Sequence, residues 1–352
     1  MANLVRENTP WLYSFWKFAR PHTVIGTTCS ILGLYLIVWS DRSLLLDNKM
    51  AMAVEQASCL LSLFLTSLLS LFLTWLACFC GNVYIVGLNQ LEDVAIDKIN
   101  KPQLPLASGE FSRSVGESIV IATGILALLL SLFQGPFLLA TVAVSLTIGT
   151  AYSLPPIRLK RFPFWAALCI FTVRGVIVNL GLFCHLQWVA ERINNYGVNI
   201  ESGLPEIQRI AWLPTARFNL PEIPPTVWAL TGFILVFTFA IAIFKDIPDI
   251  EGDRQYNIST LTIKAGTKTV FDLARGVLTF CYSGLILVLV FSGADVNLVF
   301  LGISHLIILG LMWWRSREVD LEDKGAIASF YQFIWKLFFL EYLIFPLACL
   351  LA

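Results

Sequence analysis

Residues 60–97 read LLSLFLTSLLSLFLTWLACFCGNVYIVGLNQLEDVAID. The stretch has no charged side chain before Glu92, and three of its last six residues are acidic. About 20 consecutive apolar residues suffice for a helix to cross a bilayer. The stretch therefore predicts a transmembrane helix that ends in an acidic cluster, and a second apolar run ends in the same way at residues 226–253.

The composition of the whole chain agrees with a membrane protein. Of 352 residues, 57% are hydrophobic and 14% are charged, and the mean hydropathy is +0.75. Soluble domains carry about 25% charged residues, so these values exclude a disordered protein, a secreted disulfide scaffold and an ordinary cytosolic enzyme. The formal net charge of zero gives no bulk attraction to nucleic acid.

Nine apolar runs are long enough to be membrane spans. They cover residues 22–40, 60–88, 115–133, 136–152, 164–189, 226–245, 272–292, 296–314 and 329–351. The fold class predicted is an all-α polytopic membrane protein with one domain, residues 1–352. Residues 1–20 form its N-terminal segment, and residues 190–225 form a long, proline-rich loop on the opposite side.

Charge placement predicts the orientation of the spans. Most lysines and arginines that lie between spans fall on the side of the N-terminus, and such an excess marks the cytoplasmic side. We therefore expect the N-terminus and both acidic clusters to be cytoplasmic. The first residues lack a cleavable signal pattern, which favours a directly inserted bacterial protein. The eight cysteines show no metal-binding spacing and are expected to be packing residues.

The two acidic clusters have helical spacing. Positions i, i+4 and i+8 of the first cluster share one face of a helix: Asn89, Asp93 and Asp97. Positions i, i+3 and i+7 of the second cluster also fit one face: Asp246, Asp249 and Asp253. Pro248 and Gly252 interrupt the second pattern, so this cluster is expected at a helix end or in a new first turn.

These clusters predict a site for a hard cation. Carboxylates beside a membrane core need charge compensation and are functional by default. Both clusters offer oxygen ligands and no histidine, which favours Mg2+ over zinc or a redox metal. Mg2+ commonly binds one or two carboxylates together with substrate phosphates, so facing clusters can hold Mg2+ against a diphosphate. Cations expected on the same side are Arg20, Lys98, Lys101, Lys160, Arg161 and Lys245.

Several strings of residues resemble a known family. They are Asn89-Gln-x-x-Asp93-x-x-x-Asp97, Asn100-Lys101-Pro102 and Lys245-Asp246-x-x-Asp249-x-x-Gly252-Asp253, together with Arg20-Pro-His22, Ala151-Tyr152-Ser153 and Thr172-Val-Arg174-Gly175. The chain resembles the UbiA superfamily of intramembrane aromatic prenyltransferases, which have nine helices, and within it the cyanobacterial homogentisate phytyltransferases. The likeness covers nearly the whole chain. It implies a bundle around a central cavity with its catalytic face on the cytoplasmic side.

The resemblance also implies a reaction and its residues. Mg2+ and cations stabilise the leaving diphosphate of phytyl diphosphate, and the allylic cation alkylates homogentisate with loss of its carboxylate, in tocopherol synthesis. The implied metal and catalytic residues are Asn89, Asp93, Asp97, Asp246, Asp249 and Asp253. Implied diphosphate ligands are Arg20, Lys101, Lys160, Arg161 and Lys245, and residues near the diphosphate or ring are Tyr152 and Ser153. The implied membrane is the plasma or thylakoid membrane of a photosynthetic bacterium.

Three polar residues, implied by the resemblance to bind substrate, have more than one interpretation. Arg174 in the fifth span either receives the acceptor carboxylate or neutralises an aspartate, and Arg174 and Asn179 can equally be structural. His22 either recognises the acceptor or is an interfacial residue.

The motifs leave other functions open. Sister enzymes use geranylgeranyl or solanesyl diphosphate, 4-hydroxybenzoate or chlorophyllide. A cation-coupled transporter also places acids in a membrane bundle, but it predicts them near mid-membrane with inverted repeats. The tail-length preference, the acceptor-binding residues, the role of the 190–225 loop and the oligomeric state do not follow from the sequence.

Overall fold

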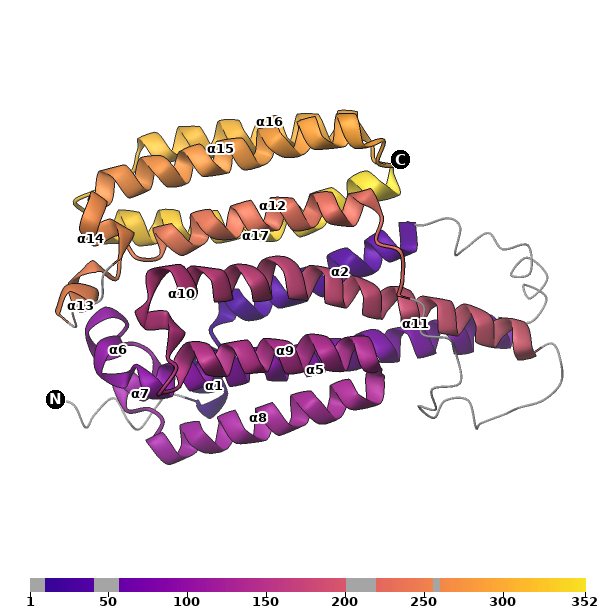
Figure 1. Cartoon of the computed structure of the whole chain (residues 1–352), viewed down its shortest axis with the longest axis horizontal. Coiled ribbons are helices and arrows are strands. Elements are labelled where there is room, and N and C mark those ends of the chain that lie inside the picture. The colour runs from indigo at the N-terminus through magenta and orange to yellow at the C-terminus, as the bar shows by residue number, and fades with distance from the viewer. Residues whose placement is uncertain (1–9, 41–56, 201–219, 256–259) are drawn as a thin grey trace.

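A computed structural model describes residues 10–40, 57–200, 220–255 and 260–352 (Figure 1). Among these residues, nine helical segments are long and apolar enough to cross a membrane. They are α2 (Pro21–Ser40), α5 (Ala57–Glu92), α8 (Arg113–Gln134), α9 (Pro136–Ser153), the rod of α10 (Pro163–Ile170), η2 (Phe171–Ile177) and α11 (Val178–Ile200), then α12 (Pro225–Phe244), α15 (Thr267–Ser292), α16 (Leu298–Arg317) and α17 (Lys324–Leu350).

The nine predicted spans are confirmed, with shifted ends. The largest shift concerns the predicted loop at 190–225, because α11 continues as a helix to Ile200. The polar residues after Trp188 extend this helix beyond its apolar part, so the prediction of a loop is wrong for residues 190–200. Residues 201–219 of the predicted loop lie outside the described part of the chain.

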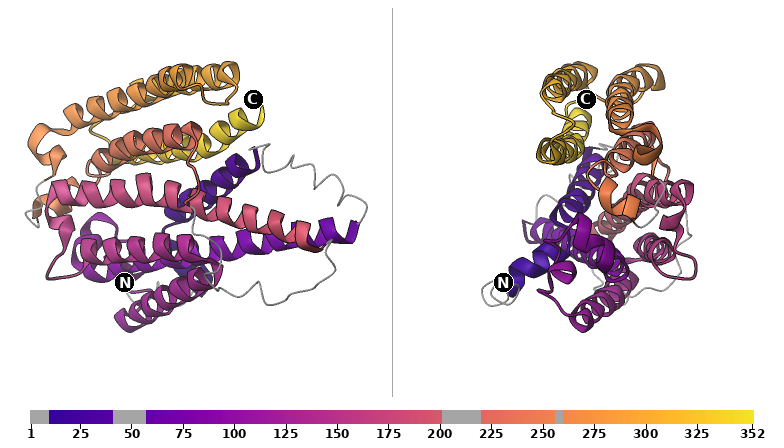
Figure 2. Two further views of the ribbon diagram at one scale, coloured as in Figure 1. Left: turned by 45° about the vertical axis from the view of Figure 1, so that its right-hand side comes forward. Right: turned by 90° about the vertical axis from the view of Figure 1, so that its left-hand side faces the viewer.

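Six of the spans form a connected inner group, and the right-hand view of Figure 2 shows the bundle end-on. Within this group, α2 contacts α5, α5 contacts α9, α9 contacts α11, η2 contacts α12, α12 contacts α17, and α17 contacts α2. The other three spans pack outside this group, α8 on α5 and α9, α15 on α12, and α16 between α15 and α17. The nine spans are thus arranged as an inner group of six and three outer helices.

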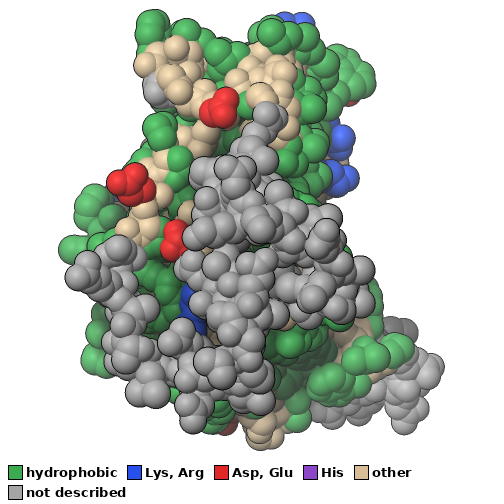
Figure 3. Space-filling view, turned by 90° about the vertical axis from the view of Figure 1, so that its right-hand side faces the viewer, with side chains coloured by type: hydrophobic (Ala, Val, Ile, Leu, Met, Phe, Trp, Pro, Cys, Tyr) green, Lys and Arg blue, Asp and Glu red, His purple; other side chains and the backbone are tan. Residues whose placement is uncertain are grey.

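The α2–α17 seam is closed by a glycine. A Cβ on Gly33 would lie 2.7 Å from the backbone oxygen of Tyr342, so only glycine permits this approach. Elsewhere the outer surfaces of the spans are apolar, and hydrophobic side chains dominate the described surface at one end of the bundle in Figure 3. Such a surface suits contact with lipid.

Five short helices gather at the other end of the bundle, which we call the cap end (Figure 1). They are α1 (Trp11–Phe18), α6 (Val94–Asn100), α7 (Pro105–Ser108), α13 (Ile250–Gln255) and α14 (Leu261–Ala265). Both acidic clusters belong to this end. The fold thus brings together two segments that lie about 150 residues apart in the sequence, as the contact between α6 and α13 shows.

Candidate active site at the cap end

The first acidic cluster is built at a break between two helices. Helix α5 ends at Glu92, Asp93 has φ −113° and ψ 15°, and α6 begins at Val94. The prediction of one unbroken helical face is therefore wrong at Asp93. The cluster still converges, because Lys160 Nζ donates to Asn89 Oδ1 at 3.0 Å and to Asp93 Oδ2 at 2.7 Å.

The remaining members of this cluster differ in their partners. Arg158 Nη2 donates to the other oxygen of Asp93 at 3.0 Å, so Asp93 lies between two cations. Asp97 is 6% exposed, and its Oδ2 has no hydrogen-bond partner within the described residues. Burial raises the pKa of Asp97 to about 6, although Arg20 and Lys101 act in the opposite direction.

The second cluster begins where α12 ends. The chain turns after Phe244 and enters α13 at Ile250, which confirms the prediction of a helix end followed by a new helix. Lys101 Nζ donates to Asp249 Oδ2 at 2.5 Å. The backbone N–H of Gly252 donates to Asn100 Oδ1 at 3.0 Å, and a Cβ on Gly252 would lie 2.3 Å from that oxygen. The segment after the first cluster, Asn100 and Lys101, therefore packs against the second cluster.

Asp246 and Asp253 of the second cluster make no ion pair with a residue that the structure describes. Burial raises the pKa of Asp253 to about 7, and the negative charges of Asp249 and Asp246 add to the effect. Burial also raises the pKa of Asp246, against the influence of Lys245. The second cluster thus carries more negative charge than its neighbours balance.

Of the other expected site residues, some lie near the clusters and one does not. Arg20 joins α1 to α2 with φ 54°, and its buried Nε has no partner within the described part of the chain. Lys245 has Tyr152, Asp246 and Asp249 as electrostatic neighbours, and the Ser153 hydroxyl is buried without a partner among the described residues. Arg161 is exposed and makes no side-chain hydrogen bond or ion pair to a described residue, so the structure does not bring it into the site.

Three residues at the site were not predicted. Arg158 was assigned to topology, yet it binds Asp93. Tyr331 has Lys245, Arg174 and Asp249 as electrostatic neighbours, and the Trp335 ring lies 4.9 Å from the ring of His22. Arg158 precedes Lys160 by two residues, and that spacing is the one signal in the sequence that the two share a target.

The donor atoms at the cap end fit a hard divalent cation. Within the described residues, no three carboxylate, histidine or cysteine side chains lie close enough together to bind a metal by themselves. The partnerless Oδ2 of Asp97 and the buried Asp253 nevertheless offer oxygen ligands whose charge is unbalanced. A cation that completes its coordination with water and phosphate oxygens suits such a set.

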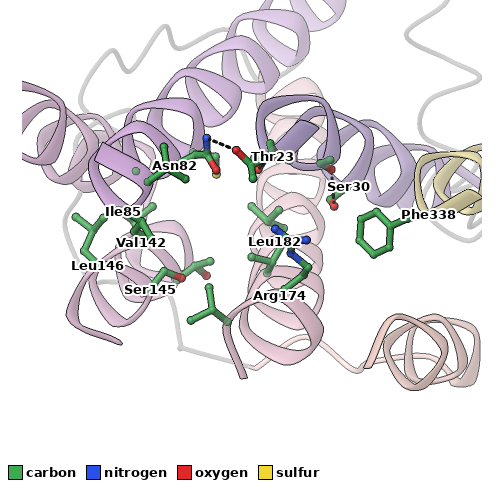
Figure 4. Close-up of a pocket in the computed structure, with 18 residues that line it drawn as sticks. Thr23, Ser30, Asn82, Ile85, Val142, Ser145, Leu146, Arg174, Leu182 and Phe338 are labelled. Carbon is green, nitrogen blue, oxygen red and sulfur yellow. Dashed lines mark hydrogen bonds between the residues drawn. The ribbon is translucent and has the colours of Figure 1, made fainter. Parts of the chain in front are cut away.

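A cavity of about 190 Å3 lies within the bundle (Figure 4). Its walls come from α2, α5, α9, α17 and the rod of η2 and α11. Polar side chains in the wall include Thr23, Asn82, Ser145 and Arg174, and Asn82 Nδ2 donates to Thr23 Oγ1 at 3.1 Å. Most of the remaining lining is apolar, including Ile85, Leu146 and Phe338.

Comparison with known proteins gives consistent matches. The pattern of the UbiA prenyltransferase family matches residues 57–337. The chain is 49% identical over 337 residues to a homogentisate phytyltransferase from Synechocystis, covering 96% of each chain. It is 36% identical over 334 residues to a chloroplastic homogentisate solanesyltransferase from Arabidopsis thaliana, covering 94% of this chain and 75% of the relative. A solved UbiA homolog from Archaeoglobus fulgidus bound to GPP and Mg2+ shares the fold, with a TM-score of 0.52, 14% identity, and coverage of 96% of this chain and 100% of that one.

Proposed function

The chain belongs to the UbiA prenyltransferase family, and from this premise we propose that it transfers a phytyl group from phytyl diphosphate to homogentisate, with loss of the carboxyl group, in tocopherol synthesis. The observation that carries the proposal is the meeting of two acidic clusters and several cations at the cap end of a bundle with an internal cavity. The high identity to the Synechocystis relative supports the choice of substrates.

The cations that pair with the clusters also suit a diphosphate. Lys160 and Arg158 bind Asp93, and Lys101 binds Asp249. The same donors can turn to phosphate oxygens when the donor substrate binds, because charge-assisted hydrogen bonds of either kind are comparable. The lysines then hold the diphosphate and leave the carboxylates free for metal.

The residues that would hold Mg2+ are the six members of the two clusters: Asn89, Asp93, Asp97, Asp246, Asp249 and Asp253. When bound, Mg2+ supplies positive charge that stabilises the departing diphosphate. Lys160, Arg158 and Lys101 add to that stabilisation from fixed positions.

The bond changes at carbon take place on the side of the site that adjoins the cavity. The allylic C–O bond of the donor breaks, and the diphosphate leaves with the electron pair. A ring carbon of the acceptor forms the new C–C bond and loses its proton, while the side-chain carboxylate leaves as CO2 and the methylene carbon takes up a proton to become a methyl group. The Trp335 ring contacts His22, and Tyr331 has Lys245 and Asp249 as electrostatic neighbours, so both rings lie near the cations of the site. Aromatic rings near the reacting carbon suit a developing cation. The apolar cavity wall excludes water that would otherwise capture it.

The same proposal covers the membrane orientation. We place the N-terminus and the cap end in the cytoplasm, in the plasma or thylakoid membrane of a photosynthetic bacterium, because the cations between spans gather at that end. A cation-coupled transporter is disfavoured, because the acids of both clusters lie at the ends of their spans.

Product formation tests the function directly. The purified protein, in nanodiscs, receives homogentisate with phytyl, geranylgeranyl or solanesyl diphosphate, with and without Mg2+. We expect a Mg2+-dependent methylphytylquinol that forms fastest with the phytyl donor. Faster transfer of another tail, or transfer only to 4-hydroxybenzoate or chlorophyllide, contradicts the substrate assignment and indicates a sister enzyme. No transfer by a folded sample with any pair contradicts the proposal as a whole.

A further inference from the structure

The fifth span contains a widened turn that is fastened by a side chain. Residues Phe171–Ile177 are π-helical, a form that recurs at functional sites. The buried Asn179 donates from Nδ2 to the carbonyl of Gly175 at 2.8 Å and to that of Arg174 at 3.3 Å. Tyr342 of α17 donates its hydroxyl proton to Asn179 Oδ1 at 2.7 Å. Two helices therefore hold the turn that carries Arg174.

Arg174 brings a positive charge into the bundle. Its guanidinium carbon lies 4.6 Å from the centre of the Trp335 ring and 5.8 Å from that of Phe338. It makes no hydrogen bond or ion pair with a side chain in the described part of the chain. Stacking on aromatic rings offsets only part of the cost of a charge within a membrane protein. The arrangement is therefore incomplete without an anion.

The aspartates of the cap end do not supply that anion. Asp93 and Asp249 pair with Arg158, Lys160 and Lys101. The cations that act most on Asp97, Asp246 and Asp253 are Arg20, Lys101 and Lys245, and Arg174 is not among them. Among the described residues, no ion pair joins Arg174 to an aspartate, which favours an anion from outside the protein.

The cavity that Arg174 faces has the size of a small ring. Its volume of about 190 Å3 is below the roughly 300–1,000 Å3 of pockets that hold drug-sized ligands. Ser145, on the α9 wall, makes no side-chain hydrogen bond to a described residue, so its hydroxyl is available to a ring substituent (Figure 4). A long prenyl chain does not fit this volume, whereas one substituted benzene ring suits it.

The cavity also adjoins the diphosphate site. His22 has Arg20, Arg174 and Lys101 as electrostatic neighbours, and its ring contacts Trp335, the residue on which Arg174 stacks. We infer that Arg174 binds the carboxylate of an aromatic acid acceptor in this cavity and that the Asn179–Tyr342 pair positions it. The inference rests on the proposed function, which it deepens by assigning the acceptor subsite.

Binding measurements separate charge recognition from folding. The Arg174→Met variant keeps a long side chain and removes the charge. Its affinity is measured in nanodiscs for homogentisate, for the uncharged primary amide of homogentisate, and for pyrophosphate with Mg2+ as a probe of the diphosphate site. Arg315→Met is the matched control, because Arg315 also stacks on a ring of α17, that of Phe333, but lies outside the cavity.

We expect Arg174→Met to weaken homogentisate binding on the order of 100-fold, with amide and pyrophosphate affinities changed by less than about threefold. Arg315→Met should change none of the three. Equal losses for homogentisate and its amide, or no loss for either, overturn the inference. If the wild-type protein prefers 4-hydroxybenzoate and Arg174→Met abolishes that preference, the subsite stands and the proposed phytyl transfer to homogentisate fails.

Discussion

The two acidic clusters at the cap end differ in how far their charge is balanced. In the first, Asp93 lies between Arg158 and Lys160. In the second, Asp249 has Lys101, a residue supplied by the segment after the first cluster, while Asp246 and Asp253 have raised pKa values because of burial. Asp93 of the first cluster is therefore held by two protein cations, whereas Asp97 of that cluster and Asp246 and Asp253 of the second depend more on a bound cation. This asymmetry leads to three predictions.

The largest effect is expected from removing the central acid of either cluster. Asp93→Ala and Asp249→Ala should each lower turnover about 1,000-fold or more, because each loses a carboxylate that faces the leaving group. The clusters should differ in pyrophosphate binding. Asp93→Ala releases Arg158 and Lys160 to the phosphate, so pyrophosphate affinity should stay high even at low Mg2+. Asp249→Ala should instead leave pyrophosphate affinity low at every Mg2+ concentration, because added Mg2+ no longer strengthens binding.

Asp295→Ala serves as the control for both variants, because this exposed residue lies between α15 and α16 at the opposite end of the bundle. Turnover is measured by product formation and binding by calorimetry. Near-normal turnover in both cluster variants contradicts the metal-diphosphate assignment. Identical Mg2+ dependence in the two contradicts the asymmetry.

A smaller effect is expected from separating the clusters. In Gly252→Ala, the new methyl group would lie 2.3 Å from Asn100 Oδ1 and push α13 away from α6. Overpacking of this kind costs about 1–3 kcal/mol, so we expect turnover to fall by roughly 5- to 150-fold. Gly310→Ala in α16 is the matched control, because nothing lies within 4 Å of its Cβ position. Equal turnover in the two variants would show that the docking of α13 on α6 is not needed for catalysis.

The smallest expected effect is a change in thermal stability with pH. The pKa of Asp97 is about 6 and that of Asp253 about 7 in the fold because of burial, whereas both lie near 4 in an unfolded chain. Between these values the folded protein binds more protons, so without divalent cations its stability should fall as pH rises from about 4 to about 7. We expect the unfolding midpoint to drop by a few °C across this range.

Mg2+ should restore the midpoint above pH 7, because it stabilises the ionised carboxylates. Thermal unfolding in detergent, recorded from pH 5 to pH 8 with and without Mg2+, measures both effects. Asp253→Asn should flatten the metal-free profile. A midpoint that rises with pH in the absence of metal would contradict the assignment of these two acids as uncompensated.

The spans followed from the sequence because their determinant is local. A run of apolar residues is sufficient to predict a membrane helix, and all nine lie where the hydropathy places them. The break at Asp93 and the cap helices did not follow, because they depend on distant partners. Asp93 is drawn to Arg158 and Lys160, more than 60 residues away, and Gly252 is fixed by Asn100.

The candidate site, like the fold, was predictable only where the signal is local in the sequence. Spacing singled out the five aspartates that the fold gathers at the cap end, since few structural roles need five aspartates at the ends of membrane helices. Arg158 was missed because an arginine at a membrane face is equally explained by topology. Trp335 and Tyr331 were missed because they are two among 11 tryptophans and 9 tyrosines, and composition does not say which of these lie near the site.

The position of the two clusters at the ends of the spans has a consequence for the direction of the reaction. In the proposed reaction, the diphosphate would leave beside the cap end into water, while the alkylated ring would leave the cavity between the membrane helices into lipid. Each buried methylene of a hydrocarbon chain favours the lipid phase by about 0.8 kcal/mol. The two products therefore separate into different phases after each turnover, and this partition opposes their recombination.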